Sequence, residues 1–155
     1  MKHEGWKFFQ GINHERLAKG KKDEKLIFEK IKHLNALPDG NFDTNFTHTK
    51  AWNNRVDYQN EDLSVSIEIK RRFKCSLDEF PFKSEDPMRD GHLSTLITAK
   101  KMEHLRENNG FLYLQYDDRL FMLDCATLTE DDYYITYPFR VKHWSIDLAC
   151  FKILD

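Results

Sequence analysis

The chain has 155 residues, of which 40% are hydrophobic and 14% are aromatic, and its formal net charge is −2. This composition excludes a fibrous or intrinsically disordered protein, and the length predicts a single folded domain over residues 1–155. Because the chain is not basic overall, an anionic partner such as a nucleic acid would have to bind a local patch of positive charge.

The sequence also limits the compartment in which the protein is expected. It has no apolar run long enough to span a membrane, and its first residues, MKHEGWKFFQG, lack the apolar core of a signal peptide. The three cysteines lie far apart without a Cys-x-x-Cys pair, which favours reduced thiols over disulfides or a zinc site. We therefore expect a cytoplasmic protein without a membrane partner.

The first part of the chain predicts a helix followed by short strands. From residue 13 to 36 the segment is charged, with apolar residues at steps of three and four. Asp23 can begin its regular part, and Leu-Pro-Asp-Gly at 37–40 ends it. Residues 41–58 predict one or two short strands, and residues 59–62 predict a turn.

The strongest strand signal lies in residues 63–70, where apolar and polar residues alternate strictly. A second helix is predicted over 93–108, a hairpin over 111–116 and 119–124, and a last strand over 144–154. The order is helix, three strands, helix, strands. It predicts an α/β domain in which helices flank a central mixed β-sheet.

Two carboxylates and a lysine near the alternating strand predict a metal site. Glu68 and Lys70 share one face of this strand, and Asp57 lies eleven positions before Glu68, across a short turn. Two converging carboxylates suit Mg²⁺ or Mn²⁺. Lys70 can orient or deprotonate a water molecule, or stabilise charge on a phosphate, so the set suits phosphodiester hydrolysis. The alternative is that Glu-Ile-Lys is the polar face of an ordinary antiparallel strand.

A run of cations follows directly. Arg71, Arg72 and Lys74 extend the positive charge of Lys70 at the end of the strand. Phosphates that flank a scissile bond need such a patch, so we expect these residues to bind nucleic acid. A solvated strand end would have the same composition.

An Asp, about ten residues, and then Glu-x-Lys on an alternating strand resembles the signature of the PD-(D/E)XK nuclease superfamily, which includes restriction endonucleases and Holliday junction resolvases. The order of predicted elements over about residues 20–125 is similar as well. Val56 stands where the superfamily has its name-giving proline. The resemblance implies a restriction-endonuclease-like α-β-β-β-α-β core.

The resemblance also implies a role for each residue of the motif. Asp57 and Glu68 would bind the divalent metal, Mg²⁺ or Mn²⁺, and the backbone carbonyl of Ile69 would be a third ligand. Lys70 would be the catalytic lysine. DNA would be the substrate, and hydrolysis would leave a 5′-phosphate.

Many members of the superfamily add a carboxylate from the first helix and a lysine from the second. Glu24 and Glu29 compete for the first role. Glu24 is the better candidate because it precedes the apolar stripe of its helix by three, four and seven residues, whereas Glu29 lies off that stripe. Lys100 and Lys101 match the second role loosely, and we expect them to bind nucleic acid, although an amphipathic helix explains both almost as well.

The sequence thus predicts a Mg²⁺-dependent deoxyribonuclease, with Holliday junction resolvase-like activity among its forms. A non-catalytic nucleic-acid-binding or assembly protein of the same fold is a second hypothesis, and an unrelated α/β interaction protein is a third. Near the C-terminus a dense aromatic cluster favours core or interface over a base-stacking platform (Tyr133, Tyr134, Tyr137, Phe139, Trp144). Such an interface would suit a homodimer, as in resolvases and many restriction enzymes.

Overall fold

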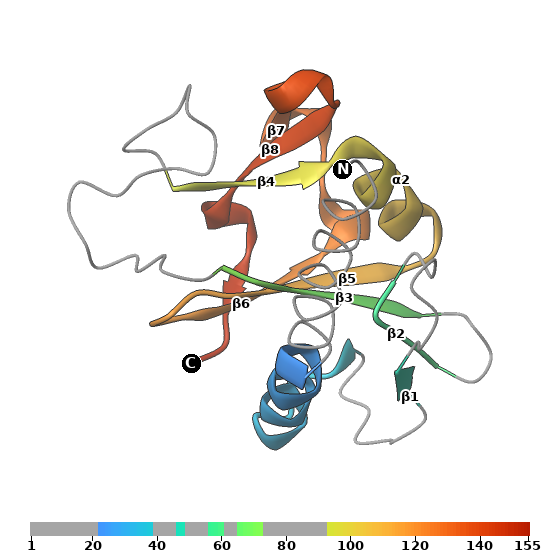
Figure 1. Ribbon diagram of the computed structural model, residues 1–155, viewed down its shortest axis with the longest axis vertical. Helices are drawn as coiled ribbons and strands as arrows, with labels where there is room; N and C mark the ends of the chain where they lie inside the picture. The colour runs from blue at the N-terminus through green and yellow to red at the C-terminus, as the bar shows by residue number, and fades with distance from the viewer. Residues whose placement is uncertain (1–21, 39–45, 49–55, 61–64, 73–92) are drawn as a thin grey trace, which may run out of the picture.

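The structure is a computed structural model that describes residues 22–38, 46–48, 56–60, 65–72 and 93–155 (Figure 1). Within these residues the protein has an α/β fold with two β-sheets. The larger sheet is mixed, with strand order β1-β2-β3-β5-β6-β9, and the smaller has the order β4-β8-β7. Among the described helices, none combines the length and apolar character that a membrane crossing needs.

The helix of residues 22–33 packs on one face of the larger sheet through its apolar side. Ile27, Phe28 and Ile31 are buried there against apolar side chains of the sheet. The ring of Phe28 stacks on that of Tyr58, with 3.9 Å between centroids. The predicted helix is therefore confirmed over these residues, and its expected beginning before residue 22 lies outside the described residues.

Three antiparallel strands follow: β1 (Phe46–His48), β2 (Tyr58–Asn60) and β3 (Ser66–Arg71). The prediction of a turn over residues 59–62 is wrong for its first half. Gln59 pairs with Ser66 of β3, and Asn60 pairs with Phe46 of β1, so that both belong to β2. The second half of that turn lies outside the described residues.

The strand β5 (Gly110–Gln115) lies parallel to β3, and β6 (Leu120–Asp124) returns antiparallel to it, which confirms the predicted hairpin. Because β5 pairs with the edge of β3 that β2 leaves open, β3 lies inside the sheet. Strands of this kind are commonly covered on both faces. Four consecutive residues of β3, from Ser66 to Ile69, are accordingly buried.

The predicted helix over 93–108 is wrong in its first half. Residues Ser94–Thr98 form the strand β4, and the helix α2 covers only Ala99–Glu107. β4 pairs along its whole length with β8 of the smaller sheet. Its β-branched residues suit this pairing, and the partner strand lies about fifty residues further along the chain. The local pattern of apolar residues does not contain that information.

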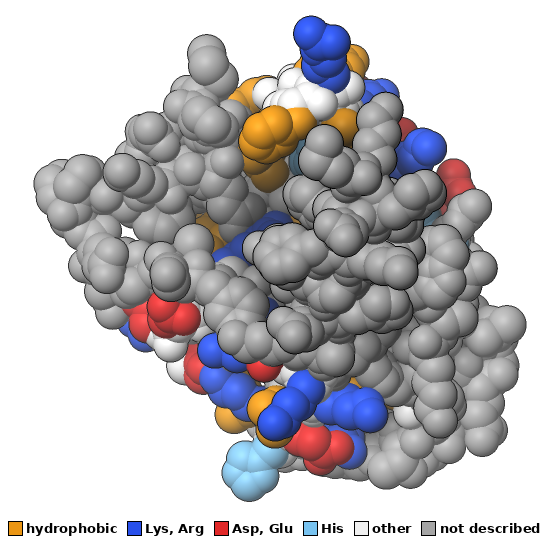
Figure 2. Space-filling view, viewed as in Figure 1, with side chains coloured by type: hydrophobic (Ala, Val, Ile, Leu, Met, Phe, Trp, Pro, Cys, Tyr) orange, Lys and Arg blue, Asp and Glu red, His pale blue; other side chains and the backbone are white. Residues whose placement is uncertain are grey.

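The predicted strand over 144–154 is divided between the two sheets. β8 (His143–Asp147) lies in the smaller sheet, a 3₁₀ turn follows, and β9 (Lys152–Ile153) pairs with β6 in the larger sheet. The chain thus crosses from one sheet to the other. β7 (Tyr133–Thr136) completes the smaller sheet, and apolar side chains lie exposed over the turn that joins it to β8 (Figure 2).

A second core fills the space on the other face of the larger sheet. It combines Met102 and Leu105 of α2, Leu112 and Leu114 of β5, and side chains of the smaller sheet that include Trp144. The helix of residues 22–33 and α2 therefore cover opposite faces of the larger sheet. This arrangement confirms the prediction of an α/β protein in which helices flank a mixed sheet.

At Gly110 the helix α2 and the strand β5 approach so closely that there is no room for a larger side chain. A Cβ atom at this position would lie 2.7 Å from the backbone Cα of Leu105, and closer still to its side chain. We expect Gly110→Ala to lower the free energy of unfolding by about 1–3 kcal/mol, as overpacked cores do. Urea denaturation measures the change.

The neighbouring Asn109 provides the control. It has a positive φ of 48°, a conformation that glycine adopts without strain. Asn109→Gly should leave the stability unchanged or raise it. Equal destabilisation by both variants would contradict the packing argument.

Candidate functional site

The site is built around Glu68, which the fold buries beneath α2. In the parallel pairing of β3 and β5, Glu68 lies beside Leu112 and Lys70 lies beside Leu114, and both leucines pack against α2. The polar face of the predicted strand therefore points at a helix and not at solvent. Glu68 is only 3% exposed. This burial contradicts the alternative reading of Glu-Ile-Lys as a solvated strand face.

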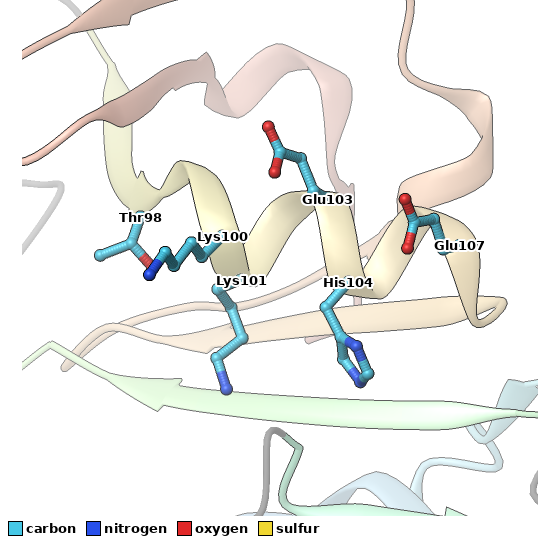
Figure 3. Close-up of a pocket in the computed structure, with 6 residues that line it drawn as sticks. All are labelled: Thr98, Lys100, Lys101, Glu103, His104 and Glu107. Carbon is cyan, nitrogen blue, oxygen red and sulfur yellow. The ribbon is translucent and has the colours of Figure 1, made fainter.

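Two lysines contact the Glu68 carboxylate, one at each oxygen. The Nζ atom of Lys70 lies 3.3 Å from Oε1, and that of Lys101 lies 3.2 Å from Oε2. Lys70 comes from the same strand, two residues on, whereas Lys101 reaches down from the first turn of α2 toward β3 (Figure 3). Of the two lysines predicted on the second helix, Lys101 therefore meets the site, and Lys100 is exposed.

Asp57 is held at the edge of β3, directly before β2 begins. Its backbone N–H donates to the carbonyl of Ile67 (2.9 Å), and its Oδ2 accepts a hydrogen bond from the backbone N–H of Ile69 (2.7 Å). These two residues flank Glu68. The carboxylate thus satisfies a backbone N–H of β3 just beyond the residues that pair with β2. The spacing of eleven residues brings Asp57 to the immediate neighbourhood of Glu68.

Glu24 of the first helix belongs to the same group. It is half-buried, and its proximity raises the pKa of the Asp57 carboxyl group. Glu29 is exposed, and its Oε1 lies 2.7 Å from the Nζ atom of Lys32. Of the two competing helix carboxylates, Glu24 is therefore the one beside Asp57.

Two carboxyl groups of the site, those of Asp57 and Glu68, carry raised pKa values. Burial and then repulsion from Glu24 raise the pKa of Asp57 to about 6, although the Ile69 N–H and Lys70 oppose the shift. Burial, followed by repulsion from Asp57, also raises the pKa of Glu68, against the effect of Lys70 and Lys101. Burial, followed by repulsion from Glu24, Asp57 and Glu29, raises the pKa of Tyr58. In the protein without ligand, burial and repulsion between acids thus outweigh the effect of the neighbouring lysines on both carboxyl groups.

The donor atoms fit a hard divalent cation. No group of three or more His, Cys, Asp or Glu side chains that could hold a metal ion occurs among the described residues. Magnesium sites often use only one or two protein carboxylates and complete their coordination with water and substrate phosphate. Asp57 and Glu68 supply two carboxylates whose mutual repulsion a cation would relieve. The carbonyl of Ile69 stays a predicted third ligand.

The basic residues after the motif have structural contacts. The Arg71 guanidinium lies 3.1 Å from Oδ1 of Asp23, and Arg72 donates a hydrogen bond of 3.0 Å to the carbonyl of Leu96 in β4. Arg72 thereby connects the end of β3 with the smaller sheet. Lys74 lies outside the described residues. The nucleic-acid-binding roles of these three cations stay predictions.

An open pocket of about 460 Å³ runs along α2, lined by Thr98, Lys100, Lys101, Glu103, His104 and Glu107. Lys101 is shared between this pocket and the ion pair with Glu68. His104 points toward β3 like Lys101, whereas Glu103 and Glu107 point away from it (Figure 3). Sequence reasoning missed His104. Its position three residues after Lys101 on one helix face was the available signal.

Comparisons with known proteins give this chain no family: no model of a protein family matches it, and no curated protein does. The argument for its function therefore depends on the residues of the site and on their geometry.

The raised pKa of Asp57 predicts how the stability of the metal-free protein depends on pH. The folded-state pKa of about 6 exceeds the ordinary aspartate pKa of 3.8, so the folded state holds this proton more tightly than the unfolded chain. Stability from this group is complete below about pH 4 and is lost as the pH rises through 6, by about 3 kcal/mol in total. Denaturation in EDTA between pH 4 and 8 measures it.

Asp57→Asn removes the ionisation and keeps an oxygen acceptor for the Ile69 N–H. We expect this variant to be more stable than the parent at pH 7 and equally stable at pH 4. Asp131→Asn, at an exposed position, is the matched control and should change neither value. A loss of stability in Asp57→Asn that is the same at both pH values would contradict the prediction.

Proposed function

We propose that this protein is a divalent-metal-dependent nuclease that hydrolyses phosphodiester bonds, with DNA as its substrate. One observation carries the proposal: the carboxylate of Glu68 is buried between two lysines, beside a second buried carboxylate, that of Asp57. Burying this many charges costs several kcal/mol, and apolar residues would stabilise the fold at least as well. Charged groups with strongly shifted pKa values are characteristic of functional sites.

The order of the elements supports the same proposal. The helix of residues 22–33 precedes the antiparallel strands β1, β2 and β3, and α2 precedes β5, which is parallel to β3. We propose that these elements form a restriction-endonuclease-like core of the PD-(D/E)XK kind. In this reading β4, β7 and β8 are an addition that covers α2.

Asp57 and Glu68 would hold Mg²⁺ or Mn²⁺, together with the carbonyl of Ile69. When bound, the cation supplies Lewis acidity toward the phosphate and lowers the pKa of a coordinated water. It would also offset the repulsion that raises the pKa of both carboxyl groups. Glu24 lies beside Asp57 and would add a third carboxylate to the acidic side of the site.

The two lysines differ in exposure, and we assign them different parts. The side chain of Lys70 is 37% exposed, so its ammonium group can leave Glu68 and meet water or a phosphate oxygen. There it would orient the attacking water and stabilise the charge that develops on the phosphate. The side chain of Lys101 is 21% exposed and would keep Glu68 ionised and in position.

A non-catalytic nucleic-acid-binding or assembly protein of the same fold is the alternative. The contacts of Arg71 with Asp23 and of Arg72 with Leu96 favour the assembly form of this alternative, because arginines that serve the fold are less available to phosphates. The two proposals differ in whether a divalent cation binds and whether DNA is cut.

Metal binding provides the first test. Calorimetric titration with Mn²⁺ should give binding to the wild-type protein and none to Glu68→Gln, which keeps the size of the side chain and removes its charge. Glu103→Gln is the matched control, because Glu103 is an exposed carboxylate on α2 that points away from β3 (Figure 3). Equal binding by all three proteins would contradict the assignment of the ligand.

Cleavage provides the second test, on labelled linear, nicked, branched and single-stranded DNA with Mg²⁺, Mn²⁺ or EDTA. Lys70→Ala should lower the cleavage rate by about 10²–10³-fold, the usual effect of losing one group that stabilises transition-state charge. Lys152→Ala, at an exposed position in β9, should stay near the wild-type rate. Metal binding without cleavage of any substrate would favour the non-catalytic alternative.

A further inference from the structure

The turn between β7 and β8 lies at the upper end of the molecule in Figure 1, and hydrophobic side chains are exposed at this end in Figure 2. Phe139 is 97% exposed, more than any other large hydrophobic side chain in the described part of the chain. Tyr137 is 63% exposed and Val141 is 49% exposed. Side chains this exposed contribute little to folding through burial, so their presence calls for another explanation.

The backbone that carries Phe139 is strained. Phe139 and Arg140 have φ values of 54° and 64°, a region that residues other than glycine rarely adopt. Hydrogen bonds from the Arg140 N–H to the Tyr137 carbonyl and from the Val141 N–H to the Pro138 carbonyl close the turn. An unfavourable conformation that displays an aromatic ring in solvent is typical of a functional contact.

Stacked aromatic rings lie in the two strands that this turn connects. The rings of Tyr133 in β7 and Trp144 in β8 stack at 3.9 Å with an interplanar angle of 4°, and Trp144 is buried. The guanidinium of Arg106 in α2 lies over the ring of Trp144, 5.7 Å from the ring centroid. The aromatic cluster near the C-terminus thus has two parts. Tyr133 and Trp144 pack inside the protein, and Tyr137 and Phe139 face outward.

The charge around the exposed rings is positive. From residue 133 to 146 the sequence contains Arg140, Lys142 and His143 but no Asp or Glu, in a chain whose net charge is −2. Arg140 and Lys142 are both exposed, and Lys or Arg side chains lie beside hydrophobic ones at this end in Figure 2. An exposed aromatic ring between cations suits a nucleic acid, whose base stacks on the ring while its phosphates meet the cations.

The turn is joined directly to the candidate site. The backbone N–H of Ala99, the first residue of α2, donates a hydrogen bond of 2.9 Å to the carbonyl of Lys142. Two residues further along α2, Lys101 contacts Glu68. A nucleic acid held at Glu68 could therefore follow the start of α2 toward Phe139.

We propose that Phe139, supported by Tyr137, is a wedge that stacks on an unpaired or unstacked base of the bound nucleic acid, while Arg140 and Lys142 contact its phosphates. The class of ligand rests on the proposed function. The wedge adds to that function a preference for substrates in which a base is already free, such as branched, flapped or single-stranded DNA.

The test measures binding without cleavage, in EDTA, with the Glu68→Gln variant as the parent. Oligonucleotides carry 2-aminopurine, whose fluorescence reports unstacking, in a full duplex, in a duplex with one unpaired base, or in a single strand. Phe139→Ala should weaken binding to the last two by about tenfold or more and remove the fluorescence change. Arg140→Ala and Lys142→Ala should weaken binding to every oligonucleotide and reduce its salt dependence.

Two further variants serve as controls for the effect of Phe139→Ala. Ile153→Ala, which truncates an exposed apolar side chain in β9 of the other sheet, should change nothing. Phe139→Gly removes the ring and relieves the positive φ, so it should lose binding like Phe139→Ala while its melting temperature stays the same or rises.

Equal affinity of Phe139→Ala and its parent for all oligonucleotides would overturn the proposal. So would a change in sedimentation without a change in DNA binding, because the turn would then be a contact between protein chains. The outcome is separate from that of the nuclease proposal. Phe139-dependent binding by a protein that never cleaves would retain the wedge alone, and metal-dependent cleavage without a role for Phe139 would retain the nuclease alone.

Discussion

The ion pairs of Glu68 with Lys70 and Lys101 depend on the position of α2, and the proposed chemistry depends on those ion pairs. A carboxylate on an inner strand is stable as an anion only if cations meet it where water is excluded. Lys70 can do so from its own strand, but Lys101 requires that α2 lie across the sheet. The smaller sheet shares a core with α2, and Arg72 connects β3 with β4. Elements far from Glu68 therefore determine its environment.

The ionised carboxylates of the site destabilise the folded protein when no ligand is bound. Asp57 lies beside Glu24 and near Glu68, and the pKa of Asp57 is about 6 because its ionised form is poorly solvated and repelled. Its hydrogen bond from Ile69 fixes the carboxylate in place but does not cancel this repulsion. Such an arrangement is expected where a ligand supplies the missing charge. The protein without ligand thus holds the carboxylates close together before any cation arrives.

Local patterns in the sequence were sufficient for the elements whose contacts are local. The helix of residues 22–33, the alternation in β3 and the hairpin of β5 and β6 could all be predicted because each depends on periodicity or on a short turn. The spacing of Asp57 and Glu68 predicted their proximity for the same reason, since β2 and β3 are joined by a short connection.

The remaining features of the fold and of the site depend on pairing between residues that are far apart in the sequence. The burial of Glu68 depends on β5, which is more than forty residues away, so the sequence could not distinguish a solvated strand face from a buried one. Pairing with β8 makes residues 94–98 a strand, although their apolar spacing also suits a helix. The choice of Lys101 over Lys100 required the phase of α2. The exposure of Phe139, beside the buried Trp144, required the complete smaller sheet.

A direct location of the cation would test the central claim, that Asp57 and Glu68 together bind a divalent metal. Crystals grown with Mn²⁺ would give an anomalous difference map in which the metal is identified by its own scattering. We predict one strong peak within coordination distance of a carboxylate oxygen of Asp57 and of Glu68, with Lys70 moved away from Oε1. A map in which Lys70 and Lys101 still hold Glu68, and in which Mn²⁺ lies elsewhere or nowhere, would contradict the account.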